Sequence, residues 1–191
     1  MIPIEIINLF ASKDMDRLIL TKPRLVDGMI VATDGRVMIE VPDIEVNFFD
    51  PAPIDGKFPN YRIMFTPELG HEAVPIRAPV IQGTREEHSH ECEICAGTKT
   101  HGFSCEVCDH MHENHMVGCD DCGGTGKILD YFAWRATCEG SETGLGGLYV
   151  EMIQQLPNVR WFKSAGESSP YPFTFGDNGR GLLMPIGKVK P

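Results

Sequence analysis

Four pairs of metal-binding residue types, all with the same spacing, occupy the middle of the chain. Three are Cys-x-x-Cys pairs and one is a His-x-x-His pair, and together they contain Cys92, Cys95, Cys105, Cys108, His112, His115, Cys119 and Cys122. A two-residue gap lets a tight turn direct both side chains at one ion. Tetrahedral structural zinc takes four such ligands, so four pairs predict two zinc ions.

The grouping of these ligands has an alternative. A single zinc could be held by four thiolates, taken from the first two cysteine pairs or from the outer two pairs. The remaining thiols would then be free or would share a metal with further histidines, namely His88, His90, His101 and His110. Cys138 stands apart from the pairs, and we expect it to be a small buried hydrophobic residue.

The glycine-rich end of the last pair suggests a different chemistry. The run CDDCGGTGK, residues 119–127, ends in Gly-Lys, as phosphate-binding loops do. Such a loop needs a glycine six residues before the lysine and a hydroxyl residue after it. Asp121 and Ile128 occupy these two positions, so the phosphate interpretation fails. We expect the glycines to let the backbone turn tightly around a metal.

Complete catalytic motifs are missing from the cysteine-rich segment. His112-Glu113-Asn114-His115 is one residue shorter than the His-Glu-x-x-His motif of metalloproteases. The Pro-Cys-x-x-Cys motif of zinc deaminases is absent as well. A zinc metalloenzyme is therefore the third hypothesis for this chain, and the sequence predicts a protein that is not an enzyme.

The charge of the chain limits its partners. The formal net charge is −10 over 191 residues, and residues 84–127 alone hold nine acidic and three basic residues. Nonspecific nucleic-acid binding depends on Lys and Arg, so this composition argues against it and leaves a local DNA contact open. No apolar run is long enough to span a membrane, and no signal peptide is evident, so we expect a cytoplasmic protein.

The elements that flank the cysteines begin with a helix and a meander. Apolar residues recur at helical spacing in IEIINLFAS, residues 4–12. Three runs then predict strands at Leu18–Leu20, Met29–Ala32 and Val37–Val41. Asp-Gly pairs at 27–28 and 34–35 separate these runs, and Asp-Gly between apolar runs is a strong signal for a hairpin.

The C-terminal part predicts a similar order of elements after proline-rich residues 50–83. We expect a strand in 128–137, a short helix that ends at Pro157, and strands at 159–164, 171–175 and 181–186. The hairpin ATDGRVMIEVP (32–42) is similar to FGDNGRGLLMPIG (175–187), which indicates an internal duplication.

These two hairpins resemble a known family. LVDGMIVATDGRVMI resembles the strand–turn–strand of the DNA sliding clamps, in particular the beta subunit of bacterial DNA polymerase III, and YPFTFGDNGRGLLMPI resembles the closing hairpin of the same family. The resemblance covers roughly residues 1–50 and 128–187. It implies one α+β clamp-like domain of two helix-plus-meander repeats. Clamp rings contain six such domains, whereas this chain has the length of one plus an insertion.

The cysteine-rich segment resembles a second family. Cys122-Gly-Gly124-Thr-Gly126 matches the Cys-x-x-Cys-x-Gly-x-Gly unit of DnaJ-type zinc domains, and Cys95-Ala-Gly97-Thr matches half of it. In that family the outer pairs share one zinc and the inner pairs share the other. The resemblance therefore implies one site of Cys92, Cys95, Cys119 and Cys122 and another of Cys105, Cys108, His112 and His115.

Together these observations predict three segments: a first clamp-like part (1–83), a zinc-binding insert (84–127) and a second clamp-like part (128–191). We expect a non-enzymatic accessory protein in DNA replication or repair that acts through a protein partner, with DNA as an open second partner. Its compact form would suit a phage or mobile element. The alternative is a DnaJ-type module that binds proteins in a zinc-dependent manner.

Overall fold

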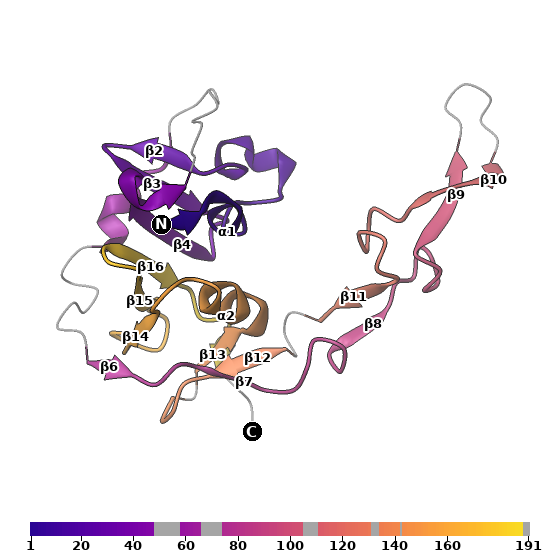
Figure 1. Ribbon diagram of the computed structural model, residues 1–191. Coiled ribbons are helices and arrows are strands. Elements are labelled where there is room, and N and C mark those ends of the chain that lie inside the picture. Colours follow the sequence, from indigo (N-terminus) through magenta and orange to yellow (C-terminus); the bar gives the residue numbers. More distant parts are fainter. Residues whose placement is uncertain (48–57, 66–73, 105–110, 131–133, 142, 189–191) are drawn as a thin grey trace. The chain divides into compact units, whose positions relative to one another are not determined.

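The computed structural model describes residues 1–47, 58–65, 74–104, 111–130, 134–141 and 143–188 (Figure 1). The chain divides into two compact units. Unit 1 comprises Met1–Gln82 and Arg135–Pro191, and unit 2 comprises Gly83–Trp134. The fold is mixed and rich in strands, with few helices, which is compatible with the predicted α+β class.

A seven-stranded antiparallel sheet forms the centre of unit 1, in the order β2-β3-β4-β16-β15-β14-β6. Its strands are β2 (Arg24–Val26), β3 (Met29–Thr33), β4 (Val37–Pro42), β16 (Gly179–Leu183), β15 (Tyr171–Phe175), β14 (Arg160–Phe162) and β6 (Pro75–Ile76). Three consecutive strands from each end of the chain thus run outward, in mirrored order, from the central pair β4–β16 (Figure 1).

Turn residues explain the two N-terminal hairpins. Asp27 and Gly28 both have positive φ, 50° and 77°, as a tight primed turn requires. In the second turn Gly35 has a φ of 93°, and Asp34 Oδ1 accepts hydrogen bonds from the backbone of Arg36 and Val37 at 2.8 and 3.0 Å. The predicted hairpins at both Asp-Gly pairs are confirmed.

One face of this sheet holds the main core. Helices α1 (Ile4–Asn8) and α2 (Gly147–Gln154) contribute buried side chains such as Ile7 and Ile153 to a cluster with alternate residues of the strands. Gly181 on β16 leaves space for the neighbouring ring, because a Cβ at this position would overlap the Phe173 side chain. The core therefore joins both ends of the chain.

The opposite face is covered by the 3₁₀ helix η3 (Tyr61–Phe65). Tyr61 and Phe65 pack against Val31, Met38 and Leu182 of the sheet. The buried carboxylate of Glu40 forms an ion pair with Arg180 on the next strand. The Arg180 guanidinium lies 4.4 Å from the centroid of the Phe65 ring. An ion pair and a cation–π contact thus bridge β4, β16 and η3.

The remaining elements of unit 1 form smaller assemblies. A four-stranded sheet has the order β17-β13-β12-β7, and β1 pairs with β5. The bounds are β17 (Gly187–Lys188), β13 (Thr143–Gly146), β12 (Arg135–Thr137), β7 (Val80–Ile81), β1 (Ile2–Pro3), β5 (Val46–Asn47), η1 (Met15–Leu20) and η2 (Asp43–Glu45). Tyr149 of α2 donates a hydrogen bond to Asp34 at 2.6 Å and so ties this helix to the N-terminal hairpin.

Unit 2 consists of two antiparallel ladders with the cysteine turns between them. Strand β8 (Ser89–Glu91) pairs with β11 (Lys127–Leu129), and β9 (Thr100–Ser104) pairs with β10 (Met111–Gly118). In the described part of this unit, the buried cluster consists of Cys92, Cys95 and Cys119, with Cys122 and Ile128 packed against it. Thiol groups thus make up most of this cluster, while Leu129 and Trp134 are buried elsewhere in the unit.

Two predicted strands are wrong. Leu18–Leu20 belongs to η1, because Asp14 accepts a hydrogen bond from the backbone of Asp16 and pairs with Arg17, which favours a helical turn. The strand predicted over 128–137 is divided, since β11 ends at Leu129 in unit 2 and β12 begins at Arg135 in unit 1. None of the helices in the described part of the chain has the length and apolar composition that a membrane crossing requires.

Candidate functional site

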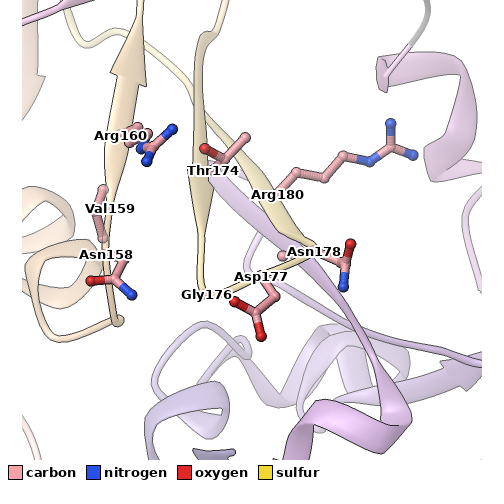
Figure 2. Close-up of a pocket in the computed structure, with 9 residues that line it drawn as sticks. Asn158, Val159, Arg160, Thr174, Gly176, Asp177, Asn178 and Arg180 are labelled. Atoms are coloured by element: carbon pink, nitrogen blue, oxygen red, sulfur yellow. The ribbon is translucent and has the colours of Figure 1, made fainter.

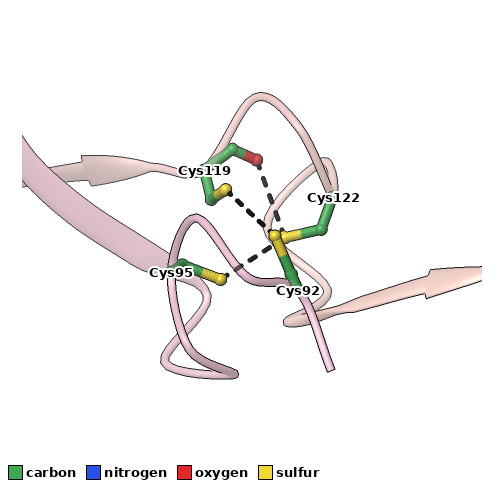
Figure 3. A group of neighbouring side chains, drawn as sticks. All are labelled: Cys92, Cys95, Cys119 and Cys122. Atoms are coloured by element: carbon green, nitrogen blue, oxygen red, sulfur yellow. Dashed lines mark hydrogen bonds between the residues drawn. The ribbon is translucent and has the colours of Figure 1, made fainter. Parts of the chain in front are cut away.

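The first and last Cys-x-x-Cys pairs come together in unit 2 (Figure 3). The sulfur atoms of Cys92, Cys95, Cys119 and Cys122 all lie within 4.8 Å of one another. The Cys92–Cys119 and Cys95–Cys122 sulfurs are each 3.8 Å apart. Tetrahedral zinc with Zn–S bonds of about 2.3 Å would separate its sulfurs by about 3.8 Å, so the four cysteines could hold one metal ion.

Two turns of the same design carry these cysteines. We call them the first knuckle (Cys92–Lys99) and the second knuckle (Cys119–Gly126). Each knuckle binds the other through its first cysteine: Cys92 N–H donates to Gly126 O at 3.0 Å, and Cys119 N–H donates to Lys99 O at 2.9 Å. The reciprocal bonds relate the knuckles by an approximate twofold arrangement, which directs both pairs of sulfurs to one point.

A threonine closes each knuckle in the same way. The Thr98 hydroxyl donates to the carbonyl groups of Cys95 or Thr100, and the Thr125 hydroxyl donates to those of Cys122 or Lys127. The backbone N–H of Gly126 also reaches the sulfur of Cys122 at 3.2 Å. N–H groups aimed at sulfur stabilise thiolates, which are the form that binds metal.

The pKa values of the four thiols differ. Burial raises the pKa of Cys122, but hydrogen bonds from the Gly126 N–H and the neighbouring thiols outweigh this effect and lower it to about 6. Burial is the main cause of the raised pKa of Cys95. Backbone N–H groups lower the pKa of Cys92 and Cys119, yet burial and a neighbouring thiol leave both raised. A divalent cation would favour the thiolate form at all four positions.

The other predicted ligands differ in how much of each residue the structure describes. Cys105, Cys108 and the reserve ligand His110 lie outside the described residues. The backbones of His101, His112 and His115 lie in β9 and β10, but their side chains are not described. His88 and His90 are described and do not belong to the group of side chains that could hold a metal. The second zinc ion therefore stays a prediction.

Cys138 behaves as the sequence predicts. Its side chain is 4% exposed and belongs to the main core of unit 1. Burial raises its pKa to about 11, so the thiol stays protonated at neutral pH. A buried neutral thiol is chemically inert, and Cys138 has a packing role.

An apolar groove of about 490 Å³ lies on the η3 face of the large sheet. It follows the junction between β4 and β16, with Met38 and Leu182 on its floor and Met184 beyond the end of β16. Ile63 and Met64 of η3 form part of its wall and are 61% and 37% exposed. Exposed apolar residues beside a preformed groove are typical of a binding surface for another protein.

Local sequence patterns do not predict this groove. Its lining comes from residues 20–38, 58–64 and 182–184, which only the folded sheet brings together. Met184 belongs to YPFTFGDNGRGLLMPI, the stretch that resembles the closing hairpin of the clamps, and this resemblance was the available signal. Ile63 and Met64 lie in a proline-rich region for which the sequence predicts only extended structure and loops.

A polar hollow of about 810 Å³ lies at the ends of β14, β15 and β16. Figure 2 shows Asp177 and Asn178 at the turn between β15 and β16, and Asn158 just before β14. Arg160 lies further along β14, and the Arg180 side chain extends away from it. Arg180 is already paired with Glu40. The hollow thus combines one acidic side chain, Asp177, with two arginines, and these do not form a metal-binding or catalytic arrangement.

Comparison with protein-family models, curated proteins and solved structures finds no match to this chain. The proposed function therefore rests on the site geometry and the two resemblances.

Proposed function

We propose that this chain is a non-enzymatic accessory protein of DNA metabolism that binds partner proteins through the apolar groove. In this proposal unit 1 is a clamp-like domain and unit 2 is held together by zinc. The observation that carries the proposal is the position of the groove at the β4–β16 junction, where the two proposed repeats meet. The mirrored strand order on either side of this junction supports an internal duplication.

Charge favours a protein partner over DNA. Neither α1 nor α2 contains a basic residue, and each contains one acid, Glu5 and Glu151. By resemblance to the clamps, these would be the helices that face DNA. A DNA-facing surface needs Lys and Arg to neutralise phosphates. We therefore propose protein binding as the main activity and leave DNA as a secondary partner.

The groove favours a short apolar peptide that carries an acidic residue. Arg36 is the charged side chain among the described residues that line it. Arg17 lies close by, since its Nη1 atom would be 2.9 Å from a Cβ at Gly35. Arg17 is already paired with Asp14, so Arg36 is the guanidinium beside the apolar floor that complements a carboxylate next to aliphatic or aromatic side chains.

Zinc is the metal that the four-cysteine cluster favours. Four thiolates in tetrahedral arrangement are the ligand set of closed structural zinc sites. Such a set leaves no open position for water or substrate, so we propose a structural role for this ion. The histidine-containing second site completes the proposal with a second zinc.

A peptide panel tests the groove. Fluorescence anisotropy would compare labelled apolar peptides that contain an acidic residue with the same peptides in which the acid is an amide. We expect the acidic peptides to bind. Ile63→Ser should lower their affinity about tenfold, because it removes an apolar side chain from the wall of the groove. Ile44→Ser is the matched control, since Ile44 is 81% exposed and does not line the groove. Equal effects of the two variants would contradict the proposed binding site.

One observation keeps the DnaJ-type alternative in view. Ile94 lies between the two cysteines of the first knuckle and is 64% exposed. An exposed isoleucine at the tip of a zinc knuckle could contact an unfolded or partner protein directly. Ile94→Ser would abolish binding in that case, whereas the groove proposal expects no effect from this substitution.

A further inference from the structure

The two knuckles of the metal centre have the same design, but their backbones differ in conformational strain. Residues of the second knuckle follow their counterparts in the first by 27 positions, and the hydrogen bonds between Cys92 and Gly126 and between Cys119 and Lys99 are equivalent. Both knuckles place three residues in the left-handed region of φ. In the second knuckle all three are glycines: Gly123, Gly124 and Gly126, at 59°, 74° and 78°.

The first knuckle has glycine at only one of these positions. Ala96 and Lys99 adopt φ values of 43° and 71°, and Gly97 stands between them at 71°. A residue with a Cβ is strained in this region, whereas glycine is not. The first knuckle therefore stores backbone strain at two residues, and the second stores none at the equivalent positions.

Backbone hydrogen bonds close both knuckles. In the second knuckle, Gly124 N–H donates to Cys119 O at 2.9 Å and Gly123 N–H donates to Asp120 O at 3.3 Å. A third backbone bond occurs in both knuckles, from Thr98 N–H to Cys95 O at 2.9 Å and from Thr125 N–H to Cys122 O at 3.2 Å, and residues 93–97 and 120–124 both form turns. The clear difference between the knuckles is therefore in their φ values, and the strained first knuckle depends more on its contacts with the metal and with the second knuckle.

We propose that the metal centre opens from one side: Cys92 and Cys95 release the metal first, while the second knuckle keeps its fold. This inference rests on the proposed zinc site and adds the order in which its two halves open. Zinc binding would then determine whether the first knuckle is folded. Strain held by a metal is relieved when the metal leaves, which makes the centre responsive to free zinc.

Solvent exposure of the four cysteines predicts the opposite order of opening. Cys122 is half-buried, whereas the other three cysteines are buried. If access of a chelator decided the order, the second knuckle would open first. The two mechanisms therefore predict opposite sequences of events.

Hydrogen exchange followed by mass spectrometry distinguishes them. The full-length zinc-loaded protein would be titrated with a chelator, and amide exchange would be measured separately in peptides that cover 92–99 and 119–126. We expect the first knuckle to lose protection at lower chelator concentration than the second. Simultaneous loss, or earlier loss in the second knuckle, would overturn the inference.

Reciprocal variants sharpen the test. The double variant Ala96→Gly with Lys99→Gly removes both strained side chains, and we expect it to raise zinc affinity about fivefold or more and to delay exchange in the first knuckle. Gly123→Ala adds a side chain at a left-handed position where no atom lies within 4 Å of the new Cβ. It should lower affinity about fivefold and bring forward exchange in the second knuckle.

Native mass spectrometry of the same samples separates two kinds of failure. A wild-type chain without metal would refute the zinc site itself. A chain that binds zinc but shows unchanged affinity in both reciprocal variants would refute only the proposed order of opening.

Discussion

The four thiols of the metal centre differ in how readily they lose their protons. With a pKa of about 6, Cys122 is already a thiolate at neutral pH, whereas the raised pKa values of Cys92, Cys95 and Cys119 keep these three protonated. A metal ion must therefore displace protons mainly from three residues. This difference arises from burial and from N–H groups aimed at sulfur, so only the folded knuckles produce it.

Zinc affinity should consequently rise with pH. Between about pH 6.5 and pH 8.5 we expect the logarithm of the apparent affinity to increase by about three for each pH unit, because binding releases roughly three protons. Below pH 6, where Cys122 also becomes protonated, the dependence should steepen and the metal should be lost. Competition with a chelator of known affinity across this pH range measures the slope. A flat profile would show that the thiols do not ligate the metal.

The four cysteine ligands could be predicted only in part from the sequence. The spacing of Cys92, Cys95, Cys119 and Cys122 predicted a metal site, and the structure brings these four side chains together. Spacing alone could not choose between the first two pairs and the outer pairs, because that choice depends on how β8 pairs with β11. Only the DnaJ resemblance favoured the outer pairs.

Secondary-structure elements followed the local signals where those signals were strong. Asp27-Gly28 and Asp34-Gly35 predicted their hairpins because each turn needs a residue that tolerates positive φ. The apolar run at Leu18–Leu20 gave the wrong element, since Asp14 and Arg17 favour a helical turn there. The order of the seven strands depends on pairing between distant segments, which no local pattern specifies.

The β4–β16 pair is where the two ends of the chain meet, and Gly181 is closely packed within it. A Cβ at this position would overlap the Phe173 ring and lie 2.7 Å from Met38 O. We expect Gly181→Ala to lower the free energy of unfolding by about 2 kcal/mol or more through overpacking. Urea denaturation of the two proteins measures the difference.

Gly166→Ala is the matched control for this substitution. A Cβ at Gly166 would make one ordinary contact, at 3.5 Å from Ser169 Oγ, and this glycine does not have positive φ. We expect a change within about 0.5 kcal/mol. Similar losses in both variants would mean that the β4–β16 junction is not closely packed.

At the scale of the whole molecule, the two units should respond separately to loss of the metal. Unit 1 has a core of aliphatic and aromatic side chains, while the buried cluster in the described part of unit 2 is made of cysteines. A unit without a large apolar core depends on its metal for folding. Unit 1 has no such dependence.

Cys119→Ser should therefore disorder unit 2 and leave unit 1 folded. Amide exchange should lose protection in residues 89–129 and keep it in the seven-stranded sheet. Cys138→Ala is the control, because Cys138 is a buried cysteine outside the metal cluster and its loss should not change metal binding. Unfolding of the entire chain by Cys119→Ser would contradict the independence of the two units.

Native mass spectrometry of the wild-type and Cys119→Ser proteins, purified without added metal, tests the central claim most directly. The four-cysteine centre predicts that the wild-type chain carries zinc and that the variant carries one ion fewer per chain. A second ion that persists in the variant would belong to the histidine-containing site. Equal metal content in the two proteins, or no metal in either, would contradict the claim that these four cysteines form a zinc centre.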